Sequence, residues 1–207
     1  MENLRTKKLT KRLLLGVTNS FGDFLGIASP FTVRFKMLMR KMFQLETPLH
    51  WDDQIPGEMK TAWIEIITEA IECGKLDFDR STKPGDAVPD LGPTVVGFSD
   101  YAEEAFEARV YFRWQRSSTH TKVEKYSARL AFCKAKVPPL DGLTVPRGEL
   151  TGLCLQSRLV LVVTAALQKL DVKPVAAVLI CDSQCSINAV DTRRKMNMIV
   201  ILNTLLD

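Results

Sequence analysis

The stretch that decides the fold is 94–115, TVVGFSDYAEEAFEARVYFRWQ. Its first six residues are mostly β-branched or aromatic, which predicts a short strand that ends at Asp100. Arg109–Gln115 predicts a second strand, and polar residues through Lys125 predict a hairpin-like turn. Tyr126–Lys136 alternates apolar and basic side chains and predicts a third strand.

A long helix and a fourth strand are expected next. The helix runs from about Arg147 to Leu170, and polar residues such as Gln156 and Arg158 interrupt its apolar run. It is therefore interpreted as a core helix and not as a membrane span. The strand, Val175–Cys181, ends at Asp182. Three strands, a helix and a further strand predict a mixed α/β sheet with a covering helix.

The first half of the chain predicts a small helical module. Helices are expected over Lys11–Thr18, Phe31–Gln44 and 55–70, the last with Pro56 at its start and Gly74 after its end. Residues 1–45 hold nine Lys or Arg against two acidic residues, a net charge of +7. Such a segment suits a phosphate backbone or an acidic partner, but a merely solvated basic face is the interpretation that charge alone favours. The Asp-, Pro-, Gly- and Ser-rich stretch 77–93 predicts a linker.

Composition narrows the class of protein. The 207 residues are 46% hydrophobic and 25% charged, which is typical of a globular protein and not of a disordered one. The five cysteines are odd in number and lie mostly in apolar runs, so they indicate reduced, buried thiols rather than disulfides. An intracellular location, cytoplasmic or nuclear, follows as an expectation. Cys181 and Cys185 are too widely spaced for a zinc-binding pair.

Three acidic residues stand at comparable positions of the predicted sheet. Asp100 ends the first strand, Glu149 opens the long helix and Asp182 ends the fourth strand. Strand ends and the start of a covering helix converge at one edge of an α/β sheet. Clustered carboxylates need cations to stay ionised, and oxygen ligands suit Mg²⁺ or Mn²⁺. For each residue alone, a turn, a cap or a helix-dipole partner remains an alternative interpretation.

Local sequence adds a family resemblance. Residues 95–112 resemble the first hairpin of retroelement ribonuclease H domains, where an S/T-D-A turn carries the first catalytic Asp. Residues 143–150, LTVPRGEL, resemble the L-T-I-P-R-x-E-L signature of BEL/Pao retrotransposon polyproteins, and Asp182-Ser183-Gln184 with Ile187 is similar to their D-S-Q-x-x-I segment. Residues 14–41 and the segment His50-Trp51-Asp52-Asp53 with Trp63 resemble the module that follows the polymerase palm.

The resemblance implies a domain plan. It implies a helical thumb or connection-like module at 1–76, a linker at 77–93, an incomplete ribonuclease H-like domain at 94–191 and a divergent tail at 192–207. The sheet is expected to lack its last elements and to leave an edge strand unpaired. Asp182-Ser183-Gln184 lacks the glycine of an aspartic protease triplet, so the "peptidase" label of the family implies no proteolysis.

The resemblance also implies site residues and partners. Asp100, Glu149 and Asp182 would be the catalytic residues and would hold Mg²⁺ or Mn²⁺. Four basic residues would contact an RNA–DNA hybrid or other nucleic acid: Lys36, Arg40, Lys41 and Arg147. Other parts of a retrotransposon polyprotein are the expected protein partners, and no membrane is expected. For Arg147, an alternative is that it orients Glu149 or is a plain surface residue.

Three departures from the family pattern bear on activity. Gly148 stands where the L-T-I-P-R-x-E-L motif has a large apolar residue, Glu107 stands where a glycine is usual, and no acid falls where a fourth metal ligand belongs. We therefore rank a weakly active or inactive ribonuclease H fragment first. A non-catalytic nucleic-acid-binding relic comes second. A working nuclease, completed by oligomerisation or by another ligand, comes third.

Overall fold

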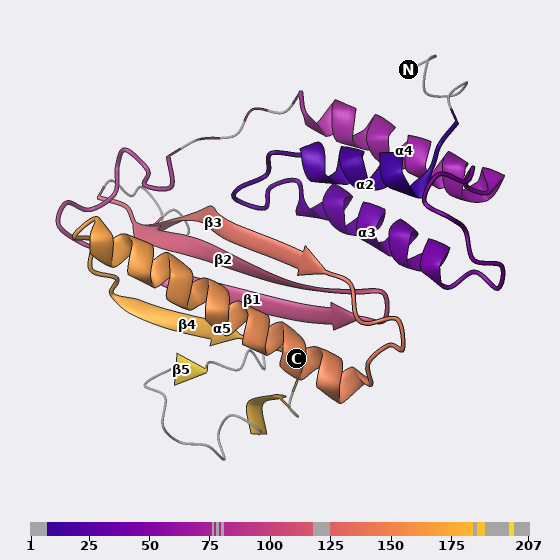
Figure 1. The fold of residues 1–207 in the computed structure, drawn as a ribbon. Helices are drawn as coiled ribbons and strands as arrows, with labels where there is room; N and C mark the ends of the chain where they lie inside the picture. The colour runs from indigo at the N-terminus through magenta and orange to yellow at the C-terminus, as the bar shows by residue number, and fades with distance from the viewer. Residues whose placement is uncertain are drawn as a thin grey trace. The chain divides into compact units, whose positions relative to one another are not determined.

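The structure is a computed structural model that describes residues 8–75, 77, 79, 81–117, 125–183, 186–188 and 199–200. The chain forms two compact units, one made of Met1–Phe78 with Ala135–Gly142 and the other of Asp79–Lys134 with Leu143–Asp207. The elements are α2 (Lys11–Ser20), α3 (Ser29–Phe43), α4 (Gly57–Cys73), β1 (Thr94–Ala102), β2 (Ala105–Gln115), β3 (Tyr126–Lys136), α5 (Val145–Lys169), β4 (Ala176–Ile180) and β5 (Ile199–Val200) (Figure 1).

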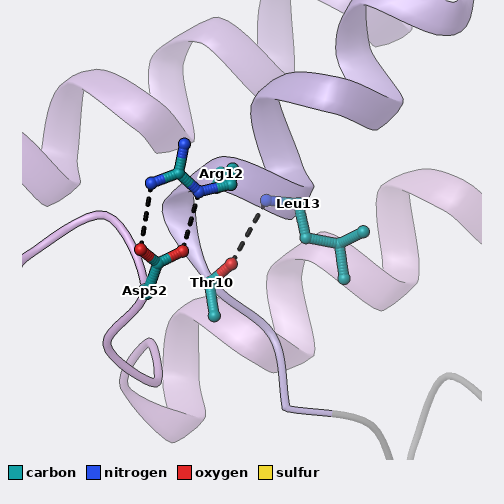
Figure 2. Close-up of polar contacts among 4 residues, drawn as sticks. All are labelled: Thr10, Arg12, Leu13 and Asp52. Atoms are coloured by element: carbon teal, nitrogen blue, oxygen red, sulfur yellow. Dashed lines mark hydrogen bonds and ion pairs between the residues drawn. The ribbon is translucent and has the colours of Figure 1, made fainter.

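The first unit contains the three expected helices. Thr10 caps α2, because its side-chain oxygen accepts a hydrogen bond from the Leu13 amide at 3.2 Å. Figure 2 shows this cap beside a two-bond ion pair in which Arg12 donates to Asp52 at 2.7 and 2.9 Å. The ion pair joins α2 to the loop before α4, so the His50–Asp53 motif has a structural role here.

The core of this unit lies between the three helices. Phe35 is 0% exposed and Trp63 is 1% exposed, and both belong to one cluster of apolar side chains from α2, α3 and α4. The polar face of α3 is tied to α4 by an ion pair between Arg34 and Glu69. Burial of one apolar stripe per helix, at three- and four-residue spacing, therefore explains why the periodicity located these helices correctly.

The segment 135–142, which comprises the last two residues of β3 and most of the loop before α5, also belongs to the first unit. The basic face of α3 binds its main chain. The Lys36 ammonium donates to the Ala135 carbonyl at 3.2 Å, and Arg40 donates to the carbonyls of Pro139 and Leu140 at 2.9 and 3.2 Å. Two of the three α3 residues that were expected to face nucleic acid therefore hold this segment.

The second unit is built on a five-stranded sheet in the order β3-β2-β1-β4-β5. β1 pairs with β2 antiparallel and with β4 parallel, and β4 pairs with β5 parallel. Figure 1 shows α5 running across one face of this sheet. The sheet is thus mixed, as the element order predicted. The two-residue β5, Ile199–Val200, lies within the stretch expected to be a divergent tail and covers the edge of β4 that was expected to be unpaired.

The core of the second unit lies between the sheet and α5. Alternate residues of β1 and β2 point toward α5, among them Val95, Ala108 and Val110, each 0% exposed. By length and composition alone α5 could cross a membrane. Its buried residues, which include Leu159, face the sheet instead. The interpretation of α5 as a core helix is consistent with this packing.

The stretch 77–93, predicted as a linker, packs on the sheet for much of its length. Ala87 belongs to the core, and the Val88 amide donates to the Gln115 carbonyl at 2.9 Å. The Trp114 indole donates to the Thr82 carbonyl at 2.6 Å. Polar composition predicted a solvated connection, but the end of β2 offers this stretch a main-chain carbonyl and an indole N–H as hydrogen-bond partners.

Candidate functional site

Asp100 lies inside β1 and does not end it, because the hairpin pairs two residues further, to Ala102 opposite Ala105. This corrects the expected strand end. The Asp100 carboxylate accepts a hydrogen bond from the Tyr101 amide at 2.8 Å. Directly opposite on β2 is Glu107, which forms an ion pair with Arg109 at 2.6 Å. The extended hairpin therefore places a second carboxylate beside Asp100, with its charge compensated.

Glu149 and Asp182 are brought together from different elements. Glu149 is in the second turn of α5, and Asp182 follows β4. Among the described residues, one carboxylate oxygen of each and the thiol sulfur of Cys181 lie within 4.8 Å of one another. Asp100 is not in this group, although it is close enough to affect the charge of Glu149. The three carboxylates thus share one edge of the sheet, and two of them are spaced to bind one cation.

Gln156 of α5 holds the two strands next to these acids. It is 0% exposed, accepts a hydrogen bond from the Ser99 hydroxyl at 3.0 Å and donates to the Ile180 carbonyl at 3.1 Å. Ser99 precedes Asp100, and Ile180 lies two residues before Asp182. A buried amide with both ends paired is costly to replace, so this bridge fixes the spacing between β1 and β4 at the site.

Two glycines of α5 face β1, but only one of them needs the absence of a side chain. A methyl group at Gly152 would be 3.6 Å from the Asp100 carbonyl oxygen, an ordinary contact. A methyl group at Gly148 would be 2.4 Å from the ring of Tyr101. Gly148 departs from the family motif, and its position explains the departure: the Tyr101 ring fills the space that a side chain at 148 would need.

The pKa of Glu149 is raised above its ordinary value. Burial of the carboxyl group contributes most, followed by the negative charges of Asp182 and Asp100. The pKa of the Cys181 thiol is also raised, mainly by burial. A site with these shifts favours protons when it holds no cation, and a divalent cation would reverse the preference by favouring the carboxylates.

This shift predicts a pH dependence of stability without metal. The folded protein binds the Glu149 proton more tightly than the unfolded chain does, so its contribution to stability falls as pH rises above the ordinary glutamate pKa of about 4.3. We expect Glu149→Gln to match the parent near pH 4 and to exceed its free energy of unfolding at pH 7. Urea unfolding in EDTA, at pH 4 and at pH 7, measures the free energy of unfolding of both proteins. Glu103→Gln, in the exposed hairpin turn, is the control. An equal difference between Glu149→Gln and the parent at both pH values would contradict the prediction.

The sheet face opposite α5 carries a groove of about 590 Å³ that reaches Asp100. Phe98 and Tyr111 form its apolar floor, with ring centroids 5.9 Å apart and an edge-to-face arrangement. Arg113 lies in the same groove, and its guanidinium is 3.6 Å from the ring centroid of Tyr126. The groove thus joins an aromatic, apolar floor to the carboxylate edge.

The basic residues expected to bind nucleic acid belong to two different units. Lys36 and Arg40 of the first unit bind main-chain carbonyls of the segment 135–142, and Lys41 is exposed near the end of α3. Arg147 belongs to the second unit and is exposed in the first turn of α5, two residues before Glu149. Of these four residues, only Arg147 is in the unit that carries the carboxylates.

Three residues at the carboxylate edge were not expected from sequence: Cys181, Gln156 and Glu107. Cys181 looked like a core thiol, and it is indeed 3% exposed, but its sulfur also lies near the acids. Of the other described cysteines, Cys133 is buried, Cys73 is half-buried and Cys154 is exposed, so buried thiols were predicted too broadly. For Gln156, the one signal in the sequence was its position as a polar residue within the apolar run of the helix, which could have indicated a buried hydrogen-bonding role.

The fold and the site together define a class. A mixed sheet in the order β3-β2-β1-β4-β5, with a helix on one face and three carboxylates at one edge, is a ribonuclease H-like domain. The chain matches the family model described as the Pao retrotransposon-like RNaseH-like domain over residues 10–183, and it belongs to that family.

One solved structure agrees with this fold. The chain aligns over its full length with a foamy viral protease-reverse transcriptase dRH in complex with double-stranded DNA, at a TM-score of 0.50 and 11% identity. A second foamy viral protease-reverse transcriptase, also with double-stranded DNA, aligns over the full chain at a TM-score of 0.43 and 11% identity. The chain spans 34% and 41% of these two proteins. No curated protein matches it.

Proposed function

We propose that this chain acts within a retrotransposon Pol polyprotein as a weak, metal-dependent nuclease on the RNA strand of an RNA–DNA hybrid. The observation that carries the proposal is the convergence of Glu149 and Asp182 to within ligand distance, with Asp100 near enough to raise the pKa of Glu149. Family membership supports the ribonuclease H-like class. The proposal also places this activity inside the cell, in the cytoplasm or the nucleus.

The residues present fit a hard divalent cation. Carboxylate oxygens are the ligands that Mg²⁺ and Mn²⁺ prefer. The pKa of Glu149 is raised mainly by burial of its carboxyl group and further by the negative charges of Asp182 and Asp100, which a bound cation would offset. Glu149 and Asp182 would hold the cation, and Asp100 would complete the site. A bound cation would supply an activated water and stabilise the leaving oxygen of a phosphodiester.

The other residues of the proposal bind and orient nucleic acid. Arg147 is exposed beside Glu149 and is suited to a phosphate near the site. Lys36, Arg40 and Lys41 form a cationic face on α3 that would contact the nucleic-acid backbone through charge. For Lys36 and Arg40 the phosphate would compete with the carbonyls that they now bind. The foamy viral protein that aligns at a TM-score of 0.50 was solved with double-stranded DNA, which agrees with a nucleic-acid partner.

Cleavage of end-labelled duplexes tests the proposal. We expect slow, Mn²⁺- or Mg²⁺-dependent cutting of the RNA strand in an RNA–DNA hybrid, with no cutting of DNA duplex or in EDTA. Equal cutting of RNA duplex and hybrid would contradict hybrid specificity. Cutting that persists in EDTA would contradict metal dependence.

One observation favours a second function, nucleic-acid binding without catalysis. Asp100 is outside the group of ligand atoms within 4.8 Å, and one of its oxygens accepts the Tyr101 amide. A site in which only two of the three carboxylates are within ligand distance of each other would bind a cation weakly. In that case the hybrid is bound, with an affinity that falls as salt rises, but it is not cut.

A further inference from the structure

Tyr101 connects the two main-chain segments that carry Asp100 and Glu149. Its side chain is on the α5 face of β1, 9% exposed, while Asp100, one residue earlier, faces the opposite side. On α5, the ring meets Gly148, one residue before Glu149. The contact therefore joins the immediate neighbours of two of the proposed metal-binding carboxylates.

The ring is held firmly in this position. Its hydroxyl donates a hydrogen bond to the Leu143 carbonyl at 3.1 Å, in the chain that leads into α5. An added Cβ at Gly148 would be 2.4 Å from two ring atoms and 2.5 Å from a third. No real Cβ tolerates such contacts, so a side chain at 148 must move either the ring or the first turns of α5.

We propose that Tyr101 is a positioning residue that sets the distance of Glu149 from Asp182 through its contact with Gly148. The inference rests on the proposed function. It predicts that the size of residues 101 and 148 together, and not of either alone, determines metal affinity. Groups that orient metal ligands typically change affinity by about 10- to 100-fold when they are altered.

The test compares two glycines of the same helix. Gly148→Ala and Gly152→Ala give α5 the same gain in helix propensity, but only the first creates a clash, since a methyl group at Gly152 would be at ordinary contact distance. We expect Gly148→Ala to weaken Mn²⁺ binding about tenfold or more. Gly152→Ala should bind Mn²⁺ like the parent. Titration calorimetry below the melting transition of every variant measures both.

An exchange of bulk distinguishes positioning from loss of structure. Tyr101→Ala and Gly148→Leu should each weaken Mn²⁺ binding, and the double variant should recover to within about threefold of the parent if volume is what matters. Equal Mn²⁺ affinity in Gly148→Ala and Gly152→Ala would overturn the proposal. A double variant no better than the single ones would overturn it as well.

Failure of the proposed function gives a different result. If the parent binds no Mn²⁺, the metal site itself is refuted, and hydrogen exchange then decides the positioning role. The amides of the first two turns of α5 should exchange faster in Gly148→Ala than in Gly152→Ala, while those near Leu159–Leu167 keep their protection. Uniform acceleration along α5, or none, would overturn the inference.

Discussion

Asp182→Asn is expected to reduce Mn²⁺-dependent cleavage of an RNA–DNA hybrid by at least about 100-fold, which corresponds to about 2.7 kcal/mol of activation free energy. The substitution keeps the shape of the side chain but removes a negative charge from the pair of carboxylates that approach within 4.8 Å. The cation then loses a ligand and the charge that attracts it. Initial rates on end-labelled hybrid, at saturating Mn²⁺, measure the effect.

The control is the same substitution at the other end of α5. Asp171 is exposed, with a φ of 55°, a backbone conformation that Asn also adopts readily. Because α5 is 25 residues long and Asp171 follows it, Asp171 is about 38 Å from the start of the helix. Asp171→Asn should cut like the parent. If Asp182→Asn retains the parent rate, these carboxylates are not the catalytic centre.

The Asp182→Asn protein should remain folded, which separates loss of chemistry from loss of structure. The Asp182 charge helps to raise the pKa of Glu149, so its removal relieves a repulsion in the metal-free site. We therefore expect its melting temperature in EDTA to equal or exceed that of the parent. In Mn²⁺ the order should reverse, since only the parent gains stability by binding the cation.

Trp63→Ala is expected to lower the free energy of unfolding of the helical unit by about 3–5 kcal/mol. Trp63 is 1% exposed in the cluster between α2, α3 and α4, and its removal leaves a cavity that these helices cannot close without moving. Such a loss is a large part of the total stability of a small unit. Urea unfolding followed by far-ultraviolet circular dichroism measures it, because the helical signal comes largely from this unit and α5.

Phe24→Ala provides the comparison for Trp63→Ala. The Phe24 side chain is 88% exposed, so its truncation removes little buried area and should change stability by less than about 0.5 kcal/mol. A Trp63→Ala protein as stable as Phe24→Ala would show that this cluster does not support the helices.

The helices and most strands were predictable because their signals are local. Pro56 and Gly74 bracket α4 within a residue of its observed ends, and the alternation over Tyr126–Lys136 matches β3. The strand end at Asp100 was wrong by two residues, since pairing with β2 carries β1 past Asp100, a residue type that is depleted in strands. The contacts that residues 82–88 make with the sheet were not predictable, because polar composition does not reveal which loops find partners on a sheet.

The sequence by itself determined the order of elements and the three acids, because periodicity and motifs are properties of neighbouring residues. Only the tertiary structure decided which groups meet: Cys181 with Glu149 and Asp182, Gln156 between β1 and β4, and Tyr101 over Gly148. The two hydrogen bonds of Gln156 alone join residues 24 and 57 positions apart through the packing of α5 on the sheet. Which residues come into contact depends on how their volumes fit together in a close-packed interior, and this cannot be read from any single position in the sequence.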